Sequence, residues 1–210
     1  MTEVPESSLG VETFDEEEAG MSDEAWRLRF WSIFLGQALS LVGSAITQFV
    51  LLWWITDKTG SAAALATAGM AMLLPQALLG PLGGVFADRH DRQVIMVLTD
   101  LVSAVCVLLL IMMFEYGNVE LWQIYVLMAI RSAMQAFQGP ASMASVATLV
   151  PPDFVPRAAG FNQTVQGLSM VGAAPLGALL LSFVPVKYAL GVDVLTAAIG
   201  ISPLLFVTIP

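Results

Sequence analysis

The fold is decided by the stretch from Phe30 to Thr56, which reads FWSIFLGQALSLVGSAITQFVLLWWIT and contains no charged residue. A helix needs about 20 apolar residues to cross the hydrocarbon core of a bilayer, so this stretch is long enough to span one. Arg27 and Arg29 stand just before it, and Trp53 and Trp54 near its far end carry amphipathic rings suited to the membrane interface. The sequence therefore predicts a membrane-spanning helix at this point.

The rest of the chain repeats that pattern. Of its 210 residues, 57% are hydrophobic and 12% are charged, whereas about a quarter of the residues in an ordinary soluble domain are charged. Uncharged or nearly uncharged runs alternate with short polar loops, and each run is long enough to cross a bilayer. They predict six spans, at about 30–56, 61–87, 93–114, 121–150, 158–185 and 188–209. The expected fold is an all-α integral membrane domain over residues 26–210.

The formal net charge of −9 comes from the first 25 residues, which hold nine acids and no base, while the rest of the chain balances eight acids against eight bases. Residues 1–25 have few large apolar side chains, so we expect a disordered acidic tail. A nucleic-acid partner would need a basic patch, which is missing. With one cysteine, Cys106, and one histidine, His90, the chain has neither a disulfide framework nor a metal-ligand cluster. We expect no cofactor.

The positions of the bases predict the orientation. If the amino terminus is cytoplasmic, the cytoplasmic side receives five bases and the opposite side receives two. The five are Arg27, Arg29, Arg89, Arg92 and Arg157, and the two are Lys58 and Lys187. Lysine and arginine concentrate in cytoplasmic loops, whereas acidic residues contribute little to this rule. We therefore expect a multi-pass protein of the cell membrane (inner or plasma membrane) with both termini in the cytoplasm.

Three ionisable residues interrupt the predicted spans: Asp100, Arg131 and Asp193. A charge at the bilayer centre costs roughly 2.5–3.5 kcal/mol on insertion scales, so each needs a structural or functional reason. Counting about 1.5 Å of rise per residue places Arg131 between the two acids in depth. Two interpretations stay open: Arg131 pairs with one acid and ties helices together, or an acid titrates in a proton pathway. We treat all three as proton-coupling candidates.

Small and amide residues form a second group of candidates. Glycines and prolines inside the spans allow close helix packing or a hinge. They are Gly80, Gly139, Pro140, Gly172, Pro175 and Gly177. Amides within the spans, among them Gln37, must hydrogen-bond a neighbour or face water. Gln48, Phe49, Gln135 and Gln138 are our candidates for the wall of a substrate cavity.

The loop after the second predicted span reads GVFADRHDRQ from Gly84 to Gln93. It resembles the signature loop of the major facilitator superfamily, which joins the second and third helices on the cytoplasmic side, where the distribution of bases independently places it. The resemblance implies a gating motif formed by Gly84, Asp88, Arg89, Asp91 and Arg92. Asp91 stands where many members have glycine, although aspartate tolerates a left-handed turn conformation. Gln93 replaces a base.

The resemblance extends over about residues 30–210. Arg131 with Gly139 is similar to the arginine and glycine of the family's fourth-helix motif, whose arginine is implied to assist proton transfer. Residues 174–178, APLGA, resemble the Gly-Pro-x-x-Gly-Gly motif of exchangers, with alanines in place of two glycines. Other short matches, such as Gly139-Pro140-Ala141, look like the macrolide-efflux-type branch of drug exporters. Family members have twelve helices, so the chain looks like an amino-terminal half, itself built as a 3+3 inverted repeat.

The resemblance implies a secondary active transporter rather than an enzyme: proton-coupled export of a hydrophobic small molecule or drug by alternating access. Its partners would be the lipid bilayer, the substrate, protons and either a carboxyl-terminal six-helix half or a second copy of the chain. One alternative is a six-helix membrane protein that acts as a homodimer or binds a partner half. Another is an intramembrane aspartyl protease using Asp100 and Asp193, which their different predicted depths and the absence of a Gly-x-Gly-Asp motif oppose.

Overall fold

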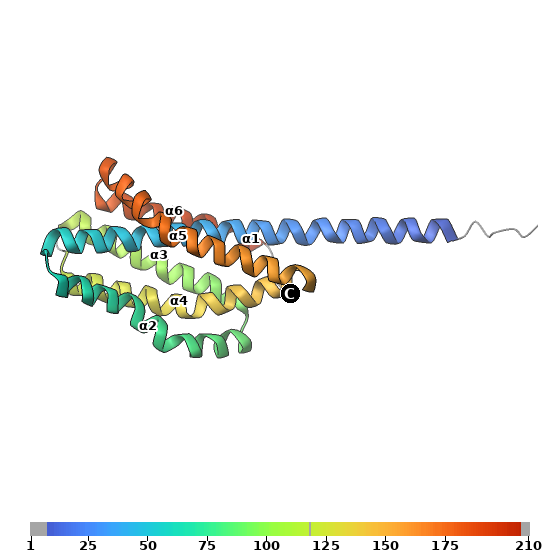
Figure 1. Ribbon diagram of the computed structural model, residues 1–210, viewed down its shortest axis with the longest axis horizontal. Helices are drawn as coiled ribbons and strands as arrows, with labels where there is room; N and C mark the ends of the chain where they lie inside the picture. The colour runs from blue at the N-terminus through green and yellow to red at the C-terminus, as the bar shows by residue number, and fades with distance from the viewer. Residues whose placement is uncertain (1–7, 118, 207–210) are drawn as a thin grey trace, which may run out of the picture.

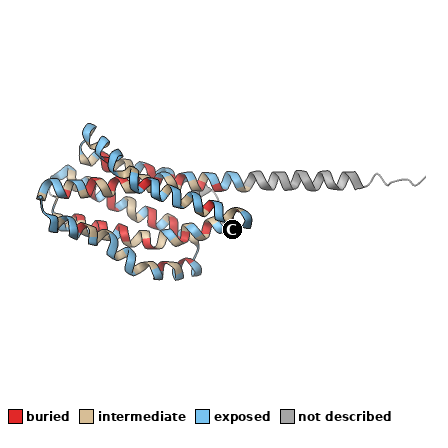
Figure 2. Ribbon diagram, viewed as in Figure 1, coloured by how far each residue is buried: buried red, intermediate tan, exposed pale blue. Residues whose placement is uncertain are grey.

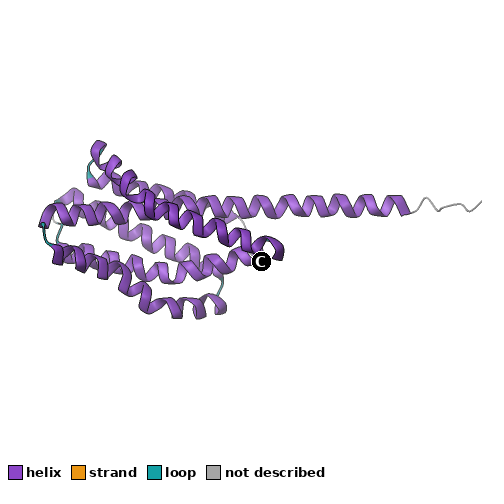
Figure 3. Ribbon diagram, in the orientation of Figure 1, coloured by secondary structure: helices purple, strands orange, loops and turns teal. Residues whose placement is uncertain are grey.

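The computed structural model describes residues 8–117 and 119–206, with side-chain surroundings for residues 26–117 and 119–202. In this part of the chain the regular structure is six α-helices and one turn of 3-10 helix (Figures 1 and 3). The α-helices are α1 (Ser8–Thr59), α2 (Ala62–Arg89), α3 (Arg92–Tyr116), α4 (Leu121–Leu149), α5 (Val155–Phe183) and α6 (Val186–Phe206), and the 3-10 turn is Pro152–Phe154.

Each predicted span coincides with one helix to within a few residues at its described ends. The clearest difference is at the start of α1, which begins at Ser8 and so continues into the segment that the composition predicts to be disordered. Extending an existing helix costs little per residue compared with nucleating one, which favours such a continuation. Residues 1–7 of the predicted tail, and the last residues of the sixth predicted span, lie outside the described residues.

Among the residues that the structure describes, four helical segments are long and apolar enough to cross a membrane by length and composition alone: Trp26–Thr59, Ala62–Arg89, Arg92–Tyr116 and Pro152–Phe183. The helix α4 is less apolar because it carries Arg131 and several glutamines. The side chains of α6 are described only as far as Ser202. The polar side chains of α4 therefore have to find partners inside the bundle.

Two glycines and a serine define the tight connections between helices. Gly60, between α1 and α2, has φ +56°, and Gly117, after α3, has φ +72°. Both values are in the left-handed region, where a side chain is disfavoured. Ser61 accepts a hydrogen bond from the backbone N–H of Ala64 at 3.4 Å and caps α2.

The helices pair in a pattern with internal symmetry. The helix α1 packs against α5 and α6, α4 packs against α2 and α3, and α3 packs against α6. Exchanging α1 with α4, α2 with α5 and α3 with α6 converts this set of pairs into itself. Such a pattern is expected of two three-helix repeats related by a pseudo-twofold axis, and it agrees with the predicted 3+3 half. Figure 1 also shows a bend in α2, which contains Pro75 and Pro81.

Close helix contacts use glycines, but not all those that the sequence suggests. A Cβ on Gly83 would collide with the backbone of α4 at Ala136, and one on Gly177 would collide with the ring of Phe49. Small residues at such points let helices approach closely. By contrast, a Cβ on Gly80 or Gly139 would meet nothing within 4 Å. Neither glycine therefore makes a close helix contact among the described residues, and their packing or hinge role stays a prediction.

Two other packing candidates, Gly172 and Pro175, lie in α5. A Cβ on Gly172 would make only an ordinary contact with Leu176, at 3.8 Å. Pro175 lies inside α5 without ending it. Both remain hinge candidates.

Figure 2 shows buried residues along the whole length of the bundle. By sequence position they form two apolar clusters toward the two ends of the helices, with a polar layer between them. One cluster contains Leu51, Leu110 and Met128, and the other contains Phe30 and Met96. Thr47 and Ser145 lie within these clusters in sequence, but most of the buried polar residues fall between them. They include Ser40, Asp100, Arg131, Ser132 and Asp193. The polar layer thus lies between two apolar ends of the bundle.

Candidate functional site

The first cluster of the polar layer joins Arg131 of α4 to Asp193 of α6. The Arg131 guanidinium donates to Asp193 Oδ2 at 2.5 Å and to Ser44 Oγ of α1 at 3.1 Å. The Ser44 hydroxyl donates in turn to Asp193 Oδ1 at 3.0 Å. Arg131 is 8% exposed and Asp193 is 3% exposed. Together they form a buried, mutually neutralised pair that connects three helices.

The second cluster surrounds Asp100 of α3 with amides. Gln37 of α1 donates to Asp100 Oδ2 at 3.1 Å, and Gln138 of α4 donates to Asp100 Oδ1 at 2.5 Å. Gln138 also donates to Gln37 Oε1 at 3.2 Å. Asp100 is only 3% exposed, while both glutamines are partly exposed. Among the described residues, this carboxylate has no cation within salt-bridge distance.

The two clusters are separate sites. Gln37 and Ser44 lie seven residues apart on α1, and Arg131 and Gln138 lie seven apart on α4, which corresponds to roughly 10 Å along each helix. Of the two open interpretations for Arg131, the geometry matches direct pairing with one acid, Asp193. The depth argument places Arg131 between the acids but does not show which one it contacts. Asp100 is left with neutral partners.

The same geometry bears on the protease alternative. An aspartyl dyad needs two carboxylates that share a proton. Asp100 and Asp193 accept hydrogen bonds from different partners, and within the described part of the chain no hydrogen bond joins them. The arrangement does not support that chemistry.

The loop between α2 and α3 holds the predicted gating motif. Asp91 caps α3 by accepting from the backbone N–H groups of Gln93 at 2.9 Å and Val94 at 3.3 Å. Its φ is −62°, so the left-handed conformation that the resemblance suggests for this position is not adopted. Arg92 donates to the carbonyl of Ala144 at 3.1 Å and fixes the start of α3 to α4. At this position Asp91 therefore caps α3 and does not adopt the turn conformation expected of a glycine.

The other charged members of the motif lie at the surface of the bundle. Asp88 and Arg89 are exposed, and neither forms a hydrogen bond or ion pair with any residue whose side-chain surroundings are described. A Cβ on Gly84 would meet nothing within 4 Å. The loop therefore presents an acid and a base that are available to a surface outside this bundle.

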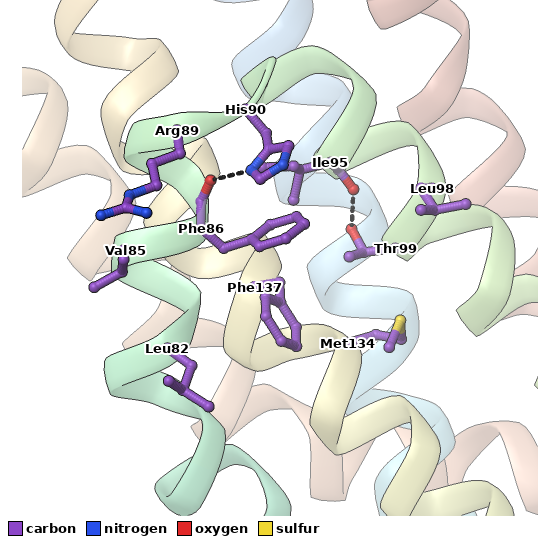
Figure 4. A pocket seen from close by; sticks show the side chains of 10 residues that line it. All are labelled: Leu82, Val85, Phe86, Arg89, His90, Ile95, Leu98, Thr99, Met134 and Phe137. Carbon is purple, nitrogen blue, oxygen red and sulfur yellow. Dashed lines mark hydrogen bonds between the residues drawn. The ribbon is translucent and has the colours of Figure 1, made fainter.

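An apolar pocket of about 600 Å³ lies beside this loop, between the second half of α2, the start of α3 and α4 (Figure 4). The rings of Phe86 and Phe137 meet edge to face in it, with centroids 5.8 Å apart. His90 stacks on Phe86 at 3.9 Å. None of the predicted cavity residues lines this pocket, so it is not the cavity that the sequence suggests.

The predicted cavity residues do not form one group in this half. Gln138 belongs to the Asp100 cluster, and the ring of Phe49 lies against Gly177. Gln48 and Gln135 are half-buried and form no hydrogen bond with the described residues. These last two amides are free to contact a ligand, and their role stays a prediction.

Ionisable side chains inside a helical membrane bundle mark candidate sites for moving ions or polar groups through a bilayer. The model of the Major Facilitator Superfamily matches residues 33–210. The chain therefore belongs to the major facilitator superfamily of membrane transporters, as its loop and its helix pairing indicate. No solved structure gives a significant match.

Curated relatives point to one branch of that family. The chain is 37% identical to Macrolide efflux protein A of Streptococcus pyogenes over 88% of its own length and 46% of the relative's. It is 35% identical to Macrolide efflux protein A of Enterococcus faecalis, over 72% of the chain and 46% of the relative. An uncharacterized transporter of the superfamily from Bacillus subtilis, YvqJ, is 26% identical over 80% of the chain and 40% of the relative. The chain thus spans less than half the length of these relatives and corresponds to an amino-terminal half of the macrolide-efflux type.

Two residues of the polar layer, Gln37 and Ser44, were not identified as site residues from the sequence, although they hold the two carboxylates. Gln138 was identified as a cavity candidate, but its hydrogen bond to Asp100 was not foreseen. The signal for Gln37 is present, because an amide inside an uncharged span must find a polar partner. Ser44 carries no such signal, since serine is common at helix contacts in membranes.

Proposed function

We propose that the chain is the first half of a secondary active exporter that moves a hydrophobic small molecule by alternating access, driven by protons. The observation that carries this proposal is the polar layer of buried ionisable residues between two apolar clusters. Such residues mark ion pathways in membrane proteins. Family membership and the efflux function in the names of two relatives support the same direction of transport.

The functional unit would be larger than the bundle. Large apolar side chains on α5 are strongly exposed, with Met170 at 85% and Val171 at 77%. Leu73 and Leu78 on α2 are also exposed. A second six-helix half would cover part of these faces and enclose the substrate near the midplane of the membrane. A second copy of the chain is the alternative, and the mass of the native polypeptide distinguishes the two.

The signature loop would act in gating. Asp88 and Arg89 lack partners within the bundle, so they are available to the facing half when the cytoplasmic side closes. Arg92 fixes the loop to α4, and Asp91 fixes it to the start of α3. In this role the loop stabilises the outward-open state.

The experiment is an accumulation assay with the full-length protein in cells, using a labelled macrolide as the first substrate. We expect expression to lower accumulation of the macrolide and a protonophore to restore it. A strain carrying an empty vector controls for other exporters. Export that persists after the proton gradient has collapsed, or that follows a sodium gradient instead, contradicts proton coupling. If accumulation of macrolides and of other hydrophobic drugs is unchanged, the proposed substrate class is wrong.

A further inference from the structure

We infer that Asp100, held by Gln37 and Gln138, is the group that binds and releases the coupling proton, and that this proton controls the contact between α1, α3 and α4. The inference rests on the proposed proton-driven export and names the proton site within it. Arg131 and Asp193 keep their charges throughout the cycle and serve as a fixed link between α4 and α6.

The charges of the polar layer select Asp100 over Asp193. When all three buried groups are ionised, Asp100, Arg131 and Asp193 together carry one negative charge. A proton on Asp100 brings this sum to zero. A proton on Asp193 would instead leave the Arg131 guanidinium buried without a counter-charge, which is strongly unfavourable. Asp100 is therefore the acid whose protonation removes the net charge from the interior of the bundle.

The surroundings of Asp100 contain no other candidate. The helix α4 contributes Arg131 and α6 contributes Asp193, roughly two helical turns away and already paired. The helix α1 has no charged residue between Arg29 and Asp57, and α2 has none before Asp88. On α3 itself, the charged residue before Asp100 is Arg92, which is bound to Ala144.

The two amides also bear on how a proton reaches Asp100. The Asp100 carboxylate is buried, but the two amides that cover it are partly exposed. In the inferred cycle, movement of the Gln138 or Gln37 side chain would expose the carboxylate to water. Asp193, in contrast, has one buried and charged partner, Arg131, besides the partly exposed Ser44.

Protonation must change the hydrogen bonds. The ionised carboxylate accepts one amide N–H on each oxygen. A carboxylic acid has an O–H that must itself donate, and the acceptors within reach are the amide oxygens of Gln37 and Gln138. One amide therefore has to turn over or withdraw when the proton binds. The contact that joins α1, α3 and α4 is different in the two protonation states.

The helix α4 is weakest next to the amide that has to move. Gln138 is followed by Gly139 and Pro140, and proline cannot supply the backbone hydrogen bond to the carbonyl of Ala136. A Cβ on Gly139 would meet nothing within 4 Å, so the backbone has room there. Protonation of Asp100 therefore acts next to the point where α4 bends most easily. It can thus cause a movement of this helix.

Infrared difference spectroscopy on the purified full-length protein in lipid nanodiscs tests the inference without substrate or gradient. Between pH 8 and pH 6, exposed acids with ordinary pKa values near 4 stay almost fully ionised. We expect the carbonyl band of a protonated carboxyl group to grow in this range and to be lost in Asp100→Asn. The matched control is the double variant Arg131→Met/Asp193→Leu, which removes the other acid and should keep the band. Gln138→Leu should move the midpoint of the band to higher pH, because the carboxylate loses a hydrogen bond.

Several outcomes overturn the inference: no band in the unmodified protein, a band that persists in Asp100→Asn, or a band that is lost in the double variant. If Asp100→Asn does not fold, Gln37→Leu and Gln138→Leu decide, and unchanged midpoints in both exclude the site. The test is independent of the export assay. A normal band in a protein whose transport ignores protonophores refutes proton coupling alone, whereas proton-driven transport without the band refutes Asp100 alone.

Discussion

At the level of single residues, the two buried acids differ in what balances their charge. Asp193 contacts an arginine at 2.5 Å, whereas Asp100 is surrounded by amides. A buried ion pair stabilises little compared with a well-packed apolar pair, but removing one member leaves an uncompensated charge. A single substitution at the pair should therefore destabilise the protein, whereas a double substitution that removes both charges should destabilise it much less.

We expect Asp193→Asn to destabilise the protein by about 3–5 kcal/mol, because it leaves Arg131 buried without a counter-charge. The measurement is the thermal unfolding of the detergent-solubilised protein. The double variant Arg131→Met/Asp193→Leu should recover most of the loss, since both charges are gone. If Asp193→Asn melts like the unmodified protein, the pair is not the fixed link that we describe.

At the level of helices, the contact between α2 and α4 depends on one glycine. A side chain at Gly83 would overlap the backbone of α4, which cannot move aside as a flexible side chain can. Overpacking of this kind costs about 1–3 kcal/mol. We expect Gly83→Val to lower the melting temperature of the protein, and the same unfolding measurement checks it.

Gly80 is the matched control for this contact, because it lies on the same helix and a Cβ there would meet nothing within 4 Å. Alanine is a better helix former than glycine by up to about 1 kcal/mol. Gly80→Ala should therefore melt at or above the temperature of the unmodified protein. Equal losses in both variants would show that the close approach at Gly83 does not exist.

The loop between α2 and α3 contains two acids with different expected roles, one structural and one in gating. Asp91 caps α3, and asparagine caps helices about as well, so Asp91→Asn should export nearly normally. Asp88 has no such local role, and Asp88→Asn should impair export while the protein still inserts and folds. Export rate, normalised to the amount of protein in the membrane, is the measurement. Normal export by Asp88→Asn would refute the gating role.

The helices themselves could be predicted from the sequence, because each contains a long run with at most one charged residue, bounded by charges and turn residues. The rotation of each helix about its own axis could not be predicted. The rise per residue gives the depth of Arg131, but whether it faces Asp100 or Asp193 depends on which side of α4 meets α6. The same limit explains why it could not be foreseen that Gly83, and not Gly80, makes the close contact: the two lie only about 60° apart around the helix, and sequence alone does not show which of them meets α4.

At the level of the whole molecule, the orientation of the bundle decides from which side the proton reaches Asp100. Asp100 lies toward the end of the polar layer next to the cluster that contains Phe30 and Met96, which is also the end with most arginines. If that end is cytoplasmic, as the distribution of bases predicts, Asp100 is nearer to the cytoplasm than Asp193. The proton would then be released from Asp100 toward the cytoplasm in the inward-open state.

Single cysteines test this orientation in intact cells. In a Cys106→Ala background, which removes the native buried thiol, we expect Lys58→Cys to react with a membrane-impermeant thiol reagent. Arg157→Cys should react only after the membrane is permeabilised, because the two exposed positions lie at opposite ends of the bundle. Lys187 is left in place, since it donates to Glu115 at 2.6 Å, a hydrogen bond that raises the pKa of the lysine and holds α6 to the end of α3. The reverse labelling pattern would place Asp100 nearer to the outside, and the proton would then have to enter where we expect it to leave.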